Sequence, residues 1–162
     1  AILSPAGASV GIGFAIPVDT VRRVVNQIVR HGRVQRPTLG VQVAADQLLR
    51  DISRRLGEPL EGALVMSVTP GSPAARAGVQ GTSRSGTGAV DLGDVITAVA
   101  GSPVRQTEDL LAAVEERRVG EVVEVSVLRG LGSAEKPRSL SLRIQLVERK
   151  ELERRMSKHS RL

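Results

Sequence analysis

Hydrophobic positions near the start of the chain first alternate with small residues and then recur at helical spacing. Residues 1–17 predict the end of one strand, a turn and a second strand, with glycine and alanine alternating with larger apolar residues over 11–16. Over 18–31, apolar residues recur three and four positions apart, which predicts an amphipathic helix. Asp19 or Thr20 is the expected cap of this helix.

From Leu39 onward the pattern predicts a compact unit of short strands and short helices, preceded by a linker over 32–38. Strands are expected over 39–43, 62–70, 94–101, 121–130 and 138–147, the last two as a hairpin. Helices are expected over 48–56, 72–78 and 108–118. The Gly-, Ser- and Thr-rich stretch 80–91 predicts a mobile loop, and the charged tail from 148 predicts a frayed helix or disorder.

Two of these helices carry start signals. Ser72 precedes Pro73, and serine as N-cap followed by proline at the first helical position is a common helix start. Thr107 is expected to cap the helix 108–118, because acidic residues follow in its first turn and arginines occupy its last turn.

Composition narrows the possible chemistry. The 162 residues are 41% hydrophobic and 25% charged, which is ordinary for a folded globular domain. There is no cysteine, and the two histidines lie far apart in sequence, so we expect no metal site and no cofactor. No apolar run is long enough for a membrane span. The net charge of +6 raises the possibility of nucleic-acid binding, but the basic residues are scattered and no Tyr or Trp is present for base stacking, so we expect none.

Three stretches with some likeness to catalytic or phosphate sites are better explained structurally. The serine in "GSP" (71–73) is accounted for as a helix cap. "GTSRSGTG" (81–88) is rich in glycine, but a phosphate loop requires lysine where Thr87 stands. The acidic pair Glu115 and Glu116 lies on the polar side of its helix. The sequence therefore contains no catalytic residues that we can assign.

The stretch "RPTLGV" (36–41) is a more specific candidate site. Gly40 lies between apolar residues at the start of a strand, which allows a close backbone approach. Successive backbone N–H groups there can form an anion-binding nest for a peptide's terminal carboxylate, and Arg36 adds positive potential nearby.

The order of these segments resembles a PDZ domain in the permuted arrangement found in proteases. The resemblance rests on "TLGV", "GALVMSVTPGSPAARAGV", "LGDVITAVAG", "TEDLLAAVEERR" and "VGEVVEVSVLRG". The upstream "GASVGIGFAIPVDTVRRVVNQIVRHGRV" resembles the end of the trypsin-like protease domain of the HtrA/Deg family, and the long "GTSRSGTGAVDLGD" loop resembles chloroplast Deg proteases. The chain departs from the family at Ala100-Gly101, where Asn-Gly is usual.

The resemblance implies an α+β fold: a small PDZ barrel of five to six strands with two or three helices, preceded by a strand pair and linker helix from a trypsin-like barrel. The implied parts are protease strands over 1–17, a linker helix over 18–35, the PDZ domain over 36–147 and a charged tail over 148–162. Residues Gly11, Ile12, Gly13 and Phe14 would be a remnant of the wall of the protease specificity pocket. The parent would be an ATP-independent serine endopeptidase whose His, Asp and Ser lie upstream, so we expect this chain to have no protease activity.

The resemblance also implies a peptide-binding site. A PDZ domain adds a peptide C-terminus as a strand beside its first strand and a helix, here 39–43 and 108–118. Backbone N–H groups of Leu39, Gly40 and Val41 would hold the carboxylate. Thr107 could face the third-from-last ligand residue. The complete set of expected binding residues is Arg36, Leu39, Gly40, Val41, Val43, Thr107, Leu111 and Val114.

Expected partners are unfolded or damaged proteins and peptide C-termini. The parent would be a trimer-based oligomer and this chain a monomer, in a chloroplast or, alternatively, a bacterial periplasm. The end Ser160-Arg161-Leu162 resembles a PDZ ligand and could bind its own or a neighbour's site. Two other hypotheses about function stay open. The chain could be a stand-alone PDZ adaptor or chaperone-like protein without a protease, or a basic surface-binding domain.

Overall fold

The computed structural model describes residues 15–84, 86, 88, 90–133 and 136–159. The chain divides into two compact units, Ala1–Gln35 and Arg36–Leu162. The expectations for residues 1–14, which include Gly11, Ile12, Gly13 and Phe14, and for the end Ser160-Arg161-Leu162 fall outside the described residues.

The first unit contains helix α1 (Val18–His31), over the range that the apolar spacing predicts. The helix starts after Pro17 without a side-chain cap, so the expected cap at Asp19 or Thr20 is wrong: both residues already lie within the helix. Gly32 ends it with φ 69°, and its N–H donates to the carbonyl of Ile28 over 2.8 Å.

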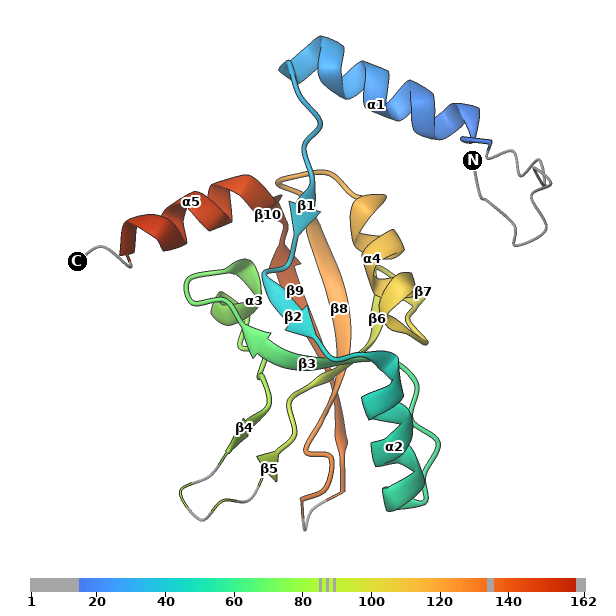
Figure 1. The fold of residues 1–162 in the computed structure, drawn as a ribbon, viewed down its shortest axis with the longest axis vertical. Helices are drawn as coiled ribbons and strands as arrows, with labels where there is room; N and C mark the ends of the chain where they lie inside the picture. The colour runs from blue at the N-terminus through green and yellow to red at the C-terminus, as the bar shows by residue number, and fades with distance from the viewer. Residues whose placement is uncertain (1–14, 85, 87, 89, 134–135, 160–162) are drawn as a thin grey trace, which may run out of the picture. The chain divides into compact units, whose positions relative to one another are not determined.

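The second unit is built on an antiparallel sheet in the order β2-β3-β6-β8-β9, with β7 paired to β6 (Figure 1). These strands are β2 (Val41–Val43), β3 (Ala63–Val68), β6 (Val95–Val99), β7 (Ser102–Pro103), β8 (Val122–Arg129) and β9 (Arg138–Gln145). Two short pairs accompany the sheet: β1 (Pro37–Thr38) with β10 (Val147–Glu148), and β4 (Ser83–Arg84) with β5 (Val90–Asp91). The strand β2 is therefore an edge strand that pairs only with β3 in this sheet.

The described residues of this unit form four helices: α2 (Asp46–Leu56), α3 (Pro73–Arg76), α4 (Thr107–Glu115) and α5 (Arg149–His159). Ser72 caps α3 as expected, because its Oγ accepts a hydrogen bond from the N–H of Ala75 over 3.1 Å. Most of the described part of the tail forms α5, and Leu152 of this helix is only 8% exposed, so this part of the tail packs against the domain.

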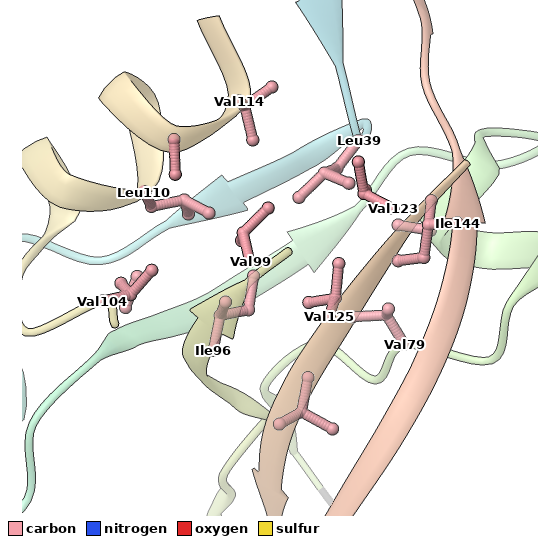
Figure 2. Packing of buried hydrophobic residues seen from close by; sticks show 14 of the residues in the cluster. Leu39, Val79, Ile96, Val99, Val104, Leu110, Val114, Val123, Val125 and Ile144 are labelled. Atoms are coloured by element: carbon pink, nitrogen blue, oxygen red, sulfur yellow. The ribbon is translucent and has the colours of Figure 1, made fainter. Parts of the chain in front are cut away.

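The main core lies between the sheet and helix α4. Figure 2 shows Leu110 and Val114 of α4 facing the same cluster as Leu39 and the inward side chains of the sheet. Valines at alternate positions of β8, namely Val123, Val125 and Val127, are each at most 2% exposed, which is the expected result of a strand with one buried face. A smaller cluster beneath α2 consists of Ala44, Leu49, Leu64, Val95 and Leu131.

Asp94 and Arg129 form a buried polar connection beside this core. Asp94 has no exposed surface, and the Arg129 guanidinium donates to both of its oxygens over 2.7 and 2.8 Å. The backbone N–H of Gln80 donates to the same carboxylate, and Arg129 also donates to the carbonyl of Gly78. The charge of Asp94 is thereby compensated, and the hydrogen bond to Asp94 raises the pKa of Arg129.

The stretch 80–91 differs from the expected loop, because β4 and β5 pair within it as a short hairpin.

The turn between β6 and β7 contains a residue other than glycine in the left-handed region. Ala100 and Gly101 both have positive φ, at 48° and 79°, as a type I′ hairpin turn requires. Asparagine adopts this conformation more readily than alanine does.

Candidate functional site: the β2 edge and helix α4

The backbone of the loop before β2 is oriented by hydrogen bonds from Thr69, just after β3, and from Ala74 of α3. The carbonyl of Leu39 accepts from the N–H of Ala74 over 3.0 Å, and the carbonyl of Gly40 accepts from the N–H of Thr69 over 2.9 Å. In a trans peptide the N–H points opposite to the C=O, and none of the described peptide bonds is cis. The N–H groups of Gly40 and Val41 therefore both point away from α3 and β3.

Two successive N–H groups that point the same way form a positive concavity suited to an anion. The N–H of Gly40 lies 3.2 Å from the Oγ1 of Thr38, which is an acceptor in the same short loop. A stronger, negatively charged acceptor such as a carboxylate can replace a hydroxyl oxygen in this role. We name the combination of this loop, β2 and α4 (residues 38–43 and 107–115) the β2–α4 site.

Position 40 requires a glycine, because of both its backbone conformation and its close neighbours. Its φ is +82°, which L side chains rarely adopt. A Cβ placed on Gly40 would lie 2.3 Å from the Cβ of Ser72 and 3.0 Å from the Cδ2 of Leu152. The loop before β2 is thus packed against the start of α3 and against helix α5.

The expected apolar lining divides into buried and exposed members. Leu39 and Val114 are 3% and 7% exposed and belong to the main core, against which the half-buried Val41 and Val43 pack. Leu111 lies on α4 with 47% of its surface exposed. An apolar side chain this exposed on the helix beside an open strand edge is available to a ligand, whereas Leu39 and Val114 already serve the fold.

Arg36 lies immediately before β1 and is exposed. Its carbonyl accepts a hydrogen bond from the N–H of Arg149 over 2.9 Å, which continues the pairing of β1 with β10. The backbone of Arg36 is thus fixed two residues before Thr38, while its guanidinium is open to solvent.

Thr107 has a different role from the expected cap. It is the first residue of α4, and Gln106 occupies the cap position. The hydroxyl of Thr107 donates to the Oδ1 of Asp46 over 2.7 Å, and its backbone N–H donates to the same oxygen over 2.9 Å. The hydrogen bond from the Thr107 hydroxyl, followed by that from its N–H, holds the pKa of Asp46 below the usual aspartate value.

Asp46 was not among the residues singled out from the sequence. It stands at the start of α2, where an acidic residue is common for its interaction with the helix dipole. Its contact with Thr107 spans 61 positions in sequence, so no local pattern indicates it.

The family comparison agrees with this architecture. The PDZ domain model matches residues 37–144, and the chain belongs to the PDZ domain family. The matched span runs from the start of β1 through all but the last residue of β9.

The similar curated proteins are HtrA/Deg-type serine proteases. "Protease Do-like 1, chloroplastic" of Arabidopsis thaliana is 46% identical over 130 residues, which are 80% of this chain and 28% of the relative. A "Probable periplasmic serine endoprotease DegP-like" of Rhizobium meliloti is 38% identical over 130 residues, again 80% of this chain and 23% of the relative. The chain thus spans about a quarter of the length of these relatives.

Solved structures of HtrA-type proteases are also similar to this chain. The HtrA-type protease AlgW with a decapeptide matches 92% of this chain and 40% of that one, with a TM-score of 0.66 and 31% identity. The serine endoprotease from Yersinia pestis matches 85% of this chain and 38% of that one, with a TM-score of 0.55 and 28% identity. The resemblance to the HtrA/Deg family is therefore confirmed.

Within the described residues, no helix is long and apolar enough to cross a membrane. The same residues contain no group of three or more His, Cys, Asp or Glu side chains positioned to hold a metal ion.

Proposed function

We propose that this domain captures peptide C-termini by adding them as a strand to the β2 edge. The observation that carries the proposal is the orientation of the Gly40 and Val41 N–H groups, which follows from the hydrogen-bonded carbonyls of Leu39 and Gly40. A terminal carboxylate bound at these N–H groups positions the ligand backbone beside β2, whose second edge is open.

The ligand's last side chain then lies against the apolar surface between β2 and α4. This surface is formed by Leu39, Val41, Leu111 and Val114. Of these, Leu111 has the largest solvent-exposed apolar area that a ligand can bury. Burial of its exposed apolar surface favours a hydrophobic last residue in the ligand. Arg36 adds a positive charge that attracts the carboxylate.

In a protein of the HtrA/Deg type, such capture supplies hydrophobic segments of unfolded or damaged proteins to a serine endopeptidase. The similarity to Protease Do-like 1 and to the DegP-like endoproteases supports this assignment. AlgW, an HtrA-type protease with a comparable fold over 92% of this chain, is known in complex with a decapeptide.

The test compares binding of fluorescent peptides that end in an apolar residue with binding of the same peptides amidated at the C-terminus. We expect amidation to weaken binding by at least about tenfold, because hydrogen bonds to a charged acceptor contribute about 1.5–3 kcal/mol. Equal affinity of free and amidated peptides would contradict carboxylate capture.

Leu111→Glu provides the matching change in the protein. Leu111 is 47% exposed, so we expect the variant to fold and to lose apolar-ended ligands. Leu56→Glu is the control, because Leu56 is a similarly exposed leucine, at 41%, at the far end of α2. Loss of binding in both variants, or in neither, would argue against the β2–α4 site.

A further inference from the structure

Hydrogen bonds join the start of α4, within the β2–α4 site, to the start of α2, which follows β2 in the chain. Asp46 begins α2, three residues after β2 ends at Val43, and Thr107 begins α4. The Oδ1 of Asp46 accepts both the hydroxyl and the N–H of Thr107, over 2.7 and 2.9 Å, and the Thr107 hydroxyl also lies 3.4 Å from the carbonyl of Ala44. The tie therefore fixes the start of α4 against the chain that leaves β2.

This arrangement determines what the Thr107 hydroxyl can offer a ligand. A hydroxyl has one proton to donate and two lone pairs that accept. The proton of Thr107 is directed to Asp46, so only acceptor capacity remains for a third group. Asp46 adds its negative charge at the same place. The guanidinium of Arg50 donates to the Oε1 of Gln47, and its positive charge also favours the ionised form of Asp46.

The position of a bound peptide places this acceptor opposite a particular ligand residue. In antiparallel addition with the last ligand residue beside Val41, the third-from-last residue lies beside Val43 and shows its side chain on the same face. The Thr107 hydroxyl lies near the carbonyl of Ala44, one residue further along. The third-from-last side chain is thus the one nearest to Thr107.

We propose that Asp46 is a specificity-determining residue, which acts through Thr107 to favour a hydrogen-bond donor and to disfavour a carboxylate at the third-from-last position of the ligand. The proposal rests on the proposed capture of peptide C-termini. It assigns to Asp46 a role beyond holding α4: the carboxylate orients the Thr107 proton away from the ligand.

The test uses three peptides that differ only in the third-from-last residue, which is Thr, Val or Glu. For the unmodified chain we expect Thr to bind best and Glu worst. Asp46→Asn, which has nearly the same shape, is expected to reduce the Thr-to-Glu ratio of affinities by about threefold or more, because it removes the negative charge and leaves only a weaker, neutral acceptor for the Thr107 hydroxyl proton.

Asp51→Asn is the matched control, because it removes the same charge from the same helix and its carboxylate contacts Gln47 and Arg54 of that helix. We expect it to leave the Thr-to-Glu ratio unchanged. Thr107→Ser, which retains the hydroxyl, is expected to keep the preference, and Thr107→Val is expected to lose it. Thermal unfolding of each variant establishes that the domain remains folded.

An unchanged Thr-to-Glu ratio in Asp46→Asn and in Thr107→Val, with binding that still requires a free carboxylate, overturns this inference and leaves the proposed function intact. An equal change in Asp51→Asn also overturns it, because general charge would then account for the preference. If no peptide binds the unmodified chain in a carboxylate-dependent manner, the proposed function itself fails together with the inference.

Discussion

Substitution of Gly40 by alanine tests the packing of the loop before β2, to which we assign carboxylate binding. The new Cβ would meet the Cβ of Ser72 at 2.3 Å, and the φ of +82° is unfavourable for any L residue. The conformation costs about 1 kcal/mol. The steric overlap adds about 1–3 kcal/mol, as overpacking does in well-packed interiors. We expect Gly40→Ala to lower the free energy of unfolding by about 2–4 kcal/mol in total.

Gly71 supplies a matched control for this change. Its φ is +69°, but an added Cβ would meet no atom within 4 Å. Gly71→Ala should therefore show only the conformational cost of about 1 kcal/mol. The difference between the two variants, measured by urea unfolding, isolates the contact of the loop with α3 and α5.

A second substitution can relieve the overlap. Ser72→Gly removes the nearest atom and retains an acceptable N-cap, so the double variant Gly40→Ala/Ser72→Gly should recover part of the lost stability. Recovery will be incomplete because Leu152 Cδ2 lies 3.0 Å from the same position. Equal destabilisation in Gly40→Ala and Gly71→Ala, with no recovery in the double variant, would refute the packing argument.

Three further changes test other parts of the account. Ala100→Asn should raise the free energy of unfolding by about 0.5–1 kcal/mol, because asparagine tolerates the positive φ of 48°; a loss of stability in thermal unfolding would count against the assigned turn. Arg129→Met should cost about 3–5 kcal/mol by leaving the fully buried Asp94 without its ion pair, and a change below about 1 kcal/mol in urea unfolding would show that the pair contributes little. Asp46 has a lowered pKa in the fold, so its contribution to the free energy of unfolding is complete above its ordinary pKa of 3.8 and is lost as pH falls from there through the lowered value. Asp46→Asn should therefore make the free energy of unfolding depend less on pH in that range. Identical acid unfolding profiles of the variant and the unmodified chain would contradict this.

Local sequence patterns were sufficient for much of the fold. The apolar spacing of 18–31 predicts α1 over its observed range, and the alternation over 121–130 and 138–147 predicts the hairpin of β8 and β9. The Ser72 cap is also predictable, because serine and the following proline act only on the adjacent turn. In each case the deciding interactions lie within a few residues of each other, or between two strands joined by one loop.

Features that depend on contacts between residues far apart in sequence could not be predicted from local sequence patterns. Thr107 has the local signature of a helix cap, yet its hydroxyl binds Asp46, which lies 61 positions earlier. Leu39 continues an alternating pattern, but the strand begins only at Val41, because Leu39 lies in the loop whose carbonyls accept hydrogen bonds from Thr69 and from Ala74 of α3. The binding residues proposed from the PDZ resemblance lie on this loop, on β2 and on α4, and their part in binding stays a prediction.

The most direct test of carboxylate capture follows the backbone amides themselves. The NMR signals of the Gly40 and Val41 N–H groups should move downfield when a peptide with a free, apolar C-terminus is added, because both groups gain a charged acceptor. The amidated peptide should leave them nearly unchanged. If the free peptide binds and these two signals do not respond, or if they respond equally to the amidated peptide, the carboxylate is not bound by this loop and the central claim is wrong.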